Sequence, residues 1–278
     1  MGRFIGDALN SVSRQTYDNW EVIVVDDCGP EDGTRKVVEL FAESCSHHRV
    51  ELIRHNENRG VSAARNSAID AAEGDLIAFL DPDDLWKPEH LALSINLFKE
   101  KPEVGIVAGP VEAFLDYDIN NRMLYPIREW QTTNFPASLA CNNFIQPSAA
   151  IIRRNVLIEA ECFTTDAKLQ HIEDYDLWIR LAKLGVKFTF RDNVTCLYRK
   201  HANAATSDLQ KMCQLHDALI HKHLTFFVQM QGLMQKNIFN RNANISDRLT
   251  GPLWARFMSL NRWLRRLRDS LSSKNSDT

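Results

Sequence analysis

Apolar and polar positions alternate between two spacings along the first half of the chain. Short apolar runs rich in β-branched residues, such as Trp20 to Val25, are typical of strands buried on both faces of a parallel sheet. Between these runs, apolar residues recur at helical spacing, as they do from Phe4 to Gln15. The predicted strands are residues 20–25, 50–54, 75–80 and 104–108, and the predicted helices are residues 4–15, 34–44, 60–72 and a segment after Pro88. This order predicts an α/β fold, in which a mostly parallel sheet is flanked by helices and binds ligands at the edge where its strands end.

The second half of the chain is less regular. From Val111 to Asp166, Pro, Asn and aromatic residues interrupt the pattern, which predicts a loop-rich acceptor-binding region. A helix is predicted to begin near Glu173 and to end before Gly185. Two further strands are predicted at residues 187–191 and 194–198, and helical sequence from about residue 207.

The composition narrows the class of protein. The 278 residues are 44% hydrophobic and carry a net charge of −3, which excludes a disordered chain and gives no overall attraction to nucleic acid. No stretch reaches the ~18 apolar residues that a membrane-spanning helix needs, and the start of the chain lacks the apolar region of a signal peptide. The six cysteines are scattered without a Cys-x-x-Cys pair, so we expect a cytoplasmic location rather than zinc ligation or disulfides.

Two acidic clusters come directly after predicted strands. Asp26 and Asp27 follow the first strand, and Asp81, Asp83 and Asp84 follow the third. Three carboxylates so close together repel one another, and a divalent cation such as Mg²⁺ or Mn²⁺ would relieve that repulsion. A solvated turn that caps the next helix explains the second cluster equally well. For the first cluster, hydrogen bonds to a nucleotide base or ribose compete with a local cap, and the residues alone favour the cap.

Three further segments carry candidate chemistry, and each has a simpler structural explanation. The run from Asn58 to Asn66 begins a helix with small residues, so Arg65 either meets a phosphate there or is an exposed arginine beside a helix cap. Glu173 and Asp174 begin a later helix, where they either favour the helix dipole or supply a general base. His201 follows the last predicted strand and either contacts a metal or diphosphate or has no role in a site.

The order of these motifs resembles that of the family 2 glycosyltransferases. VVDD, NRGVSAARN, FLDPDD, EDYDLW and YRKH follow one another between about Phe4 and Thr206. The resemblance implies a GT-A fold and transfer of a sugar from a nucleotide-sugar to an acceptor hydroxyl, with inversion of the anomeric centre. Such a transfer is one in-line displacement, which needs a base for the acceptor and charge stabilisation for the departing nucleoside diphosphate.

The resemblance assigns four residues to the nucleotide-sugar. Asp26 and Asp27 would contact the base or ribose. Arg65 and His201 would lie near the diphosphate. A UDP-sugar is the expected donor, and a glycan or lipid-linked glycan of the cell envelope is the expected acceptor.

Four more residues receive roles in metal binding and catalysis. Asp83 would hold the Mg²⁺ or Mn²⁺, with Asp81 on the ribose or beside the metal. Asp174 would deprotonate the acceptor hydroxyl, and Glu173 is the second choice for that base. Trp178 is expected to pack its helix against the core.

The chain departs from the family at its start. Family members have a strand ahead of the helix that here begins near Phe4, where this sequence has only Met1, Gly2 and Arg3. Because unpaired backbone groups inside a sheet are costly, we expect the chain as written to be poorly active. A degenerate glycosyltransferase-like domain, which binds a nucleotide or a partner without turnover, is therefore the main alternative. A phosphohydrolase of the haloacid dehalogenase type is disfavoured, because Leu85 replaces the Thr or Val expected after its Asp-x-Asp element.

The sequence predicts a catalytic domain over residues 1–206 and a helical extension over residues 207–278. Residues 253–267 form a basic amphipathic pattern with Leu and Phe on one face and Arg residues interleaved. Packing of this helix on the catalytic domain, or on a second subunit of a homo-oligomer, is favoured over peripheral contact with the inner face of the cell membrane.

Overall fold

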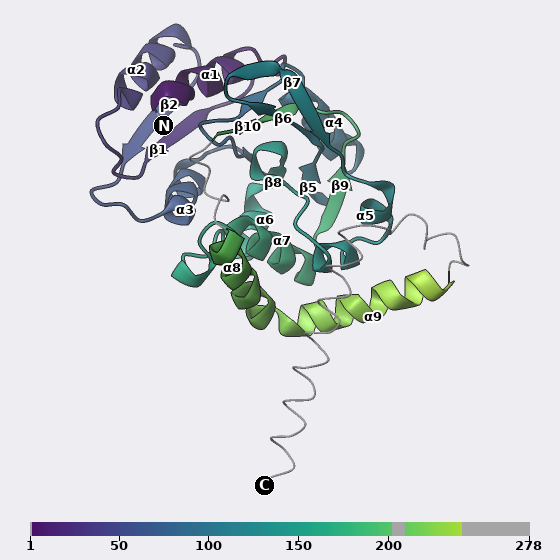
Figure 1. Cartoon of the computed structure of the whole chain (residues 1–278). Helices are drawn as coiled ribbons and strands as arrows, with labels where there is room; N and C mark the ends of the chain where they lie inside the picture. Colours follow the sequence, from purple (N-terminus) through teal and green to yellow (C-terminus); the bar gives the residue numbers. More distant parts are fainter. Residues whose placement is uncertain (1, 202–208, 241–278) are drawn as a thin grey trace. The chain divides into compact units, whose positions relative to one another are not determined.

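The computed structural model describes residues 2–201 and 209–240 (Figure 1). The described residues gather into two compact units, one of residues 2–127, 144–201 and 209–222 and the other of residues 128–143 and 223–240. The predicted domain boundary at residue 206 and the predicted amphipathic helix at 253–267 lie outside the described residues and stay predictions. Among the described residues, no helix combines the length and apolarity that crossing a bilayer requires.

The first unit begins with a parallel strand pair. Strand β1 (Val22–Asp26) pairs with β2 (Val50–Arg54) along its whole length, and α2 (Thr34–Ser44) connects them. Figure 1 shows α1 (Gly2–Ser13) and α2 on one side of this pair and α3 (Val61–Ala71) on the other. The predicted helix at 34–44 and the predicted strands at 50–54 and 104–108 are confirmed residue for residue, and the other predicted elements of the first half shift by a few positions.

A second sheet has the order β3-β8-β5-β9. Its strands are β3 (Leu76–Ala78), β8 (Ile151–Arg153), β5 (Val104–Ala108) and β9 (Lys187–Phe190). Every residue of β5 is buried, as its continuous apolar run predicts. Strand β8 comes from the segment predicted as loop-rich, and it pairs antiparallel with both β3 and β5. The α/β class is confirmed, with antiparallel pairs added to the predicted parallel ones.

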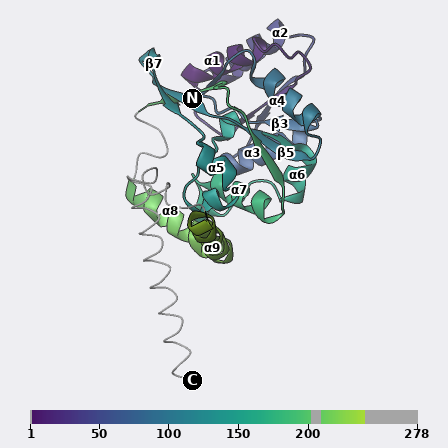
Figure 2. The same cartoon turned by 90° about the vertical axis from the view of Figure 1, so that its right-hand side faces the viewer.

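A third sheet lies beside the turn that contains Asp81, Asp83 and Asp84, which we call the acidic turn. Its order is β4-β10-β6-β7, with β4 (Leu85–Trp86), β10 (Cys196–Lys200), β6 (Val111–Leu115) and β7 (Asp118–Tyr125). Strands β6 and β7 form a hairpin where a loop was predicted, and Figure 2 shows β7 at an outer edge. Strand β10 pairs with β4 on one side and β6 on the other, so its last residues lie beside the acidic turn.

The remaining helices of the first unit are α4 (His90–Glu100), α6 (Arg154–Glu159), α7 (Glu173–Lys183) and α8 (Leu209–Lys222), with short turns η2 (Pro147–Ala149) and η3 (Ala167–Leu169). Gly185 has φ 76° after α7, the left-handed conformation in which glycine ends a helix without strain. The second unit contains α5 (Glu129–Thr133), η1 (Ala137–Ala140) and α9 (Leu224–Asn240).

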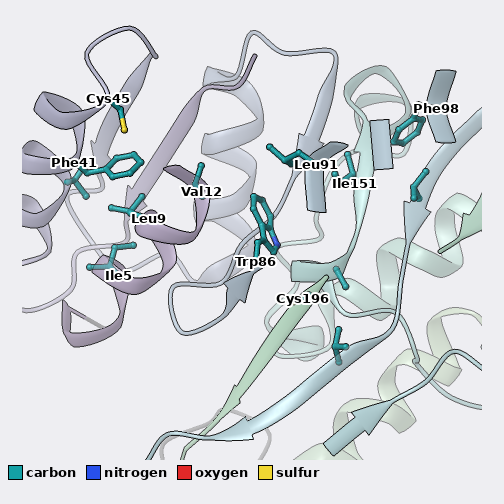
Figure 3. Close-up of a cluster of buried hydrophobic side chains, with 14 of the residues drawn as sticks. Ile5, Leu9, Val12, Phe41, Cys45, Trp86, Leu91, Phe98, Ile151 and Cys196 are labelled. Carbon is teal, nitrogen blue, oxygen red and sulfur yellow. The ribbon is translucent and has the colours of Figure 1, made fainter. Parts of the chain in front are cut away.

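The core of the first unit joins elements that are far apart in sequence (Figure 3). Trp86 lies near its centre, where its indole Nε1 donates to the carbonyl of Ser148 at 2.6 Å and its ring stacks on His90. The labelled side chains around it come from α1, α2, α4, β8 and β10: Ile5, Leu9, Val12, Phe41, Cys45, Leu91, Phe98, Ile151 and Cys196. Each fully buried large apolar side chain contributes about 1.5–3 kcal/mol, so this cluster stabilises the packing of α1, α2 and α4 against β4, β8 and β10. All six cysteines are free in the structure.

Candidate functional site

Arg65 connects two acidic segments of the candidate site. Its Nη2 donates to Asp81 Oδ1, and its Nη1 donates to Glu173 Oε1, both at 2.8 Å. Asp81 begins the turn after β3, and Glu173 begins α7. Arg65, on α3, places its positively charged guanidinium between them. Burial lowers the pKa of the Arg65 guanidinium, but the carboxylates of Asp81 and Glu173 outweigh it and hold that pKa above its usual value. The family resemblance implies that Arg65 lies near the diphosphate, whereas the structure pairs it with carboxylates.

The acidic turn presents Asp83 to His201. The imidazole Nε2 of His201 lies 2.9 Å from Asp83 Oδ2, and the histidine side chain is only 5% exposed. The ring of Phe4 lies against this imidazole, with centroids 5.4 Å apart. Nδ1 of His201 is buried without a hydrogen-bond partner among the described residues. Asp83 and His201, which are 118 positions apart in the sequence, are thus brought into contact.

Arg199 and Asp84 support this turn. Asp84 was predicted only as a member of the acidic cluster, and no role was predicted for Arg199. The backbone N–H of Arg199 donates to Asp84 Oδ1 at 3.0 Å, and its guanidinium Nε donates to the carbonyl of Asp83 at 2.9 Å. Burial, with the charge of Asp81 nearby, raises the pKa of the Asp84 carboxyl well above its usual value. The available signal was the arginine two positions before His201 in YRKH, at the end of a predicted strand.

The donor atoms at this turn suit a divalent cation in their chemistry. A carboxylate and an imidazole are common ligands, and Mg²⁺ or Mn²⁺ sites often take one or two protein carboxylates together with substrate phosphate oxygens. The ligand atoms of Asp81, Asp83 and His201 do not all lie within 4.8 Å of one another in the described chain. Asp81 is turned toward Arg65, which leaves Asp83 and His201 as the candidate pair. Metal binding by Asp83 and Asp81 stays a prediction.

The first acidic pair forms a separate network. Asp27 accepts hydrogen bonds from the backbone N–H groups of Arg59 and Gly60, at 2.9 and 2.6 Å, and contacts His55 Nδ1 at 2.7 Å. Burial raises the pKa of the Asp27 carboxyl, but these hydrogen bonds outweigh it and lower that pKa. Asp27 thereby holds the loop that begins α3. Its predicted contact with a nucleotide stays a prediction.

Asp26 lies at the same strand end and has its own partners. Gly29 N–H donates to Asp26 Oδ1 at 2.8 Å, and Arg54 Nη1 lies 3.0 Å from Asp26 Oδ2. The local cap expected from the residues alone is therefore present. A nucleotide contact by Asp26 also stays a prediction.

The first turn of α7 contains carboxylates in three different environments. Glu173 is 5% exposed, and its Oε2 has no hydrogen-bond partner among the described residues. Asp174 is partly exposed, and its Oδ1 accepts from the N–H of Tyr175 at 2.8 Å. Asp176 is fully buried and pairs with Arg180 and with Lys222. Among these three, Asp174 is the one that is not buried.

Trp178 packs α7 as expected. Its side chain is fully buried, and its Nε1 donates to the carbonyl of Ile145 at 3.1 Å. This hydrogen bond ties α7 to the segment before β8. The residue is part of the scaffold of the site.

The fold and the arrangement of acidic groups define a glycosyltransferase of the GT-A class. The family model described as "Glycosyl transferase family 2" matches residues 2–160, which is more than half of the chain. The chain belongs to glycosyl transferase family 2. The predicted family resemblance and enzyme class are confirmed, and the phosphohydrolase alternative is wrong.

Two relatives show how far the similarity extends. TuaG of Bacillus subtilis (strain 168), which is named as a teichuronic acid biosynthesis glycosyltransferase, is 37% identical over 75% of this chain and 78% of its own length. WfgD of Escherichia coli, named as a UDP-Glc:alpha-D-GlcNAc-diphosphoundecaprenol beta-1,3-glucosyltransferase, is 28% identical over 64% of each chain.

Solved structures share the fold at lower identity. Staphylococcus aureus TarS 1-349 in complex with UDP-GlcNAc aligns with a TM-score of 0.66 and 18% identity, covering 92% of this chain and 75% of that one. The mannosyltransferase PcManGT from Pyrobaculum calidifontis, in complex with GDP-Man and Mn²⁺, aligns with a TM-score of 0.58 and 22% identity, covering 80% of this chain and 61% of that one. These similarities confirm the GT-A-like fold.

Proposed function

We propose that this glycosyltransferase moves a sugar from a nucleoside diphosphate sugar, with UDP as the expected nucleotide, to a hydroxyl of a glycan or lipid-linked glycan. The observation that carries the proposal is the arrangement around Arg65: the acidic turn and the start of α7 meet through one guanidinium. The names of WfgD and of the TarS complex support a UDP-sugar, and the acceptor named for WfgD supports a lipid-linked glycan.

The donor end of the site consists of Asp83, in the acidic turn, and His201, which contacts it. A divalent cation held by these two side chains would supply positive charge to the departing diphosphate. The Mn²⁺ in the PcManGT complex supports such a cation. Asp26 and Asp27, at the end of β1, are proposed to orient the nucleoside, with Asp81 on the ribose side of the turn.

The acceptor end is the first turn of α7. Asp174 is proposed to remove the proton of the acceptor hydroxyl as that oxygen attacks the anomeric carbon from the face opposite the diphosphate, which inverts the configuration. Glu173 is the weaker candidate, because one of its oxygens is paired with Arg65 and the side chain is buried. Arg65 positions both ends and carries positive charge beside them.

The test is a panel of UDP- and GDP-sugars with Mn²⁺, in which nucleoside diphosphate release is measured and the anomer of the product is read by NMR. We expect Asp174→Asn to lower kcat/KM by about 10²–10⁴-fold while donor binding stays unchanged, because only the base is lost. Asp83→Asn is expected to weaken donor binding as well, and Asp192→Asn, an exposed carboxylate, is the matched control.

Three results would contradict the proposal. Full activity in Asp174→Asn together with loss of activity in Glu173→Gln would show that Glu173, and not Asp174, is the base. Donor binding without turnover of any acceptor would support the degenerate, binding-only alternative. A product that retains the donor's anomeric configuration would refute inversion.

A further inference from the structure

A second cluster of metal-ligating side chains lies at the opposite end of the β1–β2 pair. Asp18 precedes β1, whereas His47 and His48 precede β2, so all three lie at the amino ends of these parallel strands. One ligand atom from each residue lies within 4.8 Å of the other two. The candidate nucleotide residues lie at the carboxyl ends, about 15 Å away along strands of five residues. The cluster is therefore separate from the site described above.

His48 is held in a fixed orientation. Its ring stacks on Trp20 with centroids 3.5 Å apart and planes 2° apart, and its side chain is 7% exposed. Its Nε2 lies 2.7 Å from the carbonyl oxygen of Asp18 and 3.3 Å from Asp18 Oδ1. Nδ1 has no hydrogen-bond partner among the described residues. Because a carbonyl oxygen only accepts, Nε2–H of His48 donates to Asp18 in the metal-free chain. Nε2 can bind a metal ion only in the tautomer protonated on Nδ1, in which the metal replaces that hydrogen bond.

The spacing of the two best-defined ligand atoms fits zinc. Ligands at the usual Zn–N and Zn–O distances in a tetrahedral site are separated by about 3.3 Å. Asp18 Oδ1 and His48 Nε2 lie 3.3 Å apart. The ring of His47, with its centroid 4.1 Å from that of His48, supplies a third donor. Two imidazoles and one carboxylate favour Zn²⁺ over Mg²⁺, which prefers an all-oxygen environment.

We propose that Asp18, His47 and His48 bind a Zn²⁺ ion that joins the loop before β1 to the turn before β2. Water fills the fourth position, because Asp18 and His47 are exposed. An ion pair between a protonated His48 and Asp18 would explain the 3.3 Å contact without a metal, but it would leave His47 without a function in the cluster.

Zinc binding to the full chain separates these two explanations. Metal-free protein would be titrated with Zn²⁺ against a chromophoric chelator at pH 7.5, and the same titration would be repeated in an Asp83→Ala background to remove the contribution of the acidic turn. We expect His47→Ala and Asp18→Asn each to lower the zinc affinity of this site at least tenfold. The matched control is His221→Ala, an exposed histidine on α8, which should leave the affinity unchanged.

Thermal melting supplies a second measurement. Zn²⁺ should raise the melting temperature of the wild-type chain and of His221→Ala, and should raise it less in His47→Ala and Asp18→Asn, because only the folded site binds the ion. Equal zinc affinity and an equal melting shift in the wild type and in both cluster variants would overturn the proposal. Substitution of His48 itself is avoided, because its ring also packs on Trp20.

Discussion

A guanidinium buried between two carboxylates has no neutral state at physiological pH, so its partners decide whether it stabilises or destabilises the fold. Arg65 has a side chain that is 12% exposed, and both of its carboxylate contacts have good hydrogen-bond geometry. The ring of Phe163 faces the same guanidinium, with its centroid 5.2 Å from Cζ. At the residue scale, this side chain therefore links the function of the site to the stability of the chain.

We expect Arg65→Met to lower the free energy of unfolding by about 3–5 kcal/mol, because Glu173 would remain buried and charged without its partner. The double variant Arg65→Met/Glu173→Gln should recover much of that loss, since no uncompensated charge is left. Urea denaturation at pH 7 measures both. Lys36→Met, which breaks an exposed pair with Glu39, is the control and should change stability by less than about 1 kcal/mol. Equal losses in the single and double variants would contradict a charge-based cause.

At the element scale, most strands and helices of the first half could be predicted, whereas β8 and the β6–β7 hairpin could not. The helix at 34–44 carries three turns of amphipathic spacing, whereas β8 has three residues and no period to recognise. What makes Ile151–Arg153 a strand is its place between β3 and β5, which is a long-range contact. The β6–β7 hairpin was missed for a related reason, since the exposed residues of β7 lack an alternating pattern.

The same distinction holds within the site. Asp81, Asp83 and His201 could be selected from the sequence motifs that contain them. The contact between Asp83 and His201 is compatible with those motifs. The pairing of Arg65 with Glu173 across 108 positions depends on how α3 and α7 pack, which local sequence does not encode. The support that Arg199 gives to the turn depends on the pairing of β10 with β4 in the same way.

The loop that begins α3 depends on one glycine. Gly60 has φ 86° and ψ 163°, a conformation available almost only to glycine, and its N–H donates to Asp27. We expect Gly60→Ala to lower the free energy of unfolding by about 1–3 kcal/mol from backbone strain, because an added Cβ would meet only Gln170 Nε2 at 3.5 Å.

The matched control for that loop is Gly232→Ala within α9, where nothing lies within 4 Å of an added Cβ. That variant should gain about 0.5–1 kcal/mol from helix preference. Chemical denaturation of both variants measures the difference. An effect of the same sign in both would show that the backbone conformation at Gly60 is not the cause.

At the scale of the whole molecule, a partly exposed carboxyl, that of Asp27, and a buried one, that of Asp84, shift its acid stability in opposite directions. The pKa of Asp27 is lowered in the folded chain, so its contribution is present above the unfolded value of about 3.8 and is lost as the pH falls through the folded pKa. The pKa of Asp84 is raised, so its contribution is fully present below the unfolded value and is lost as the pH rises toward the folded pKa.

We therefore expect Asp27→Asn to be most destabilising at neutral pH, with an effect that shrinks below about pH 3.8. Asp84→Asn should instead be stabilising relative to the wild type at neutral pH and nearly neutral in acid. Free energies of unfolding between pH 3 and 7, with EDTA present to exclude metal, measure both trends. Parallel pH profiles for the two variants would contradict the opposite shifts.

The double contact of Arg65 also has a kinetic consequence. If a cation and a donor substrate draw Asp81 away, the guanidinium keeps Glu173 and its charge acts on the first turn of α7, where Asp174 lies. Binding of the donor at one end of the site would thereby change the charge around the other end, through the side chain of Arg65. For an enzyme with two substrates, this arrangement favours a compulsory order of addition, in which the nucleotide-sugar binds first and the acceptor second.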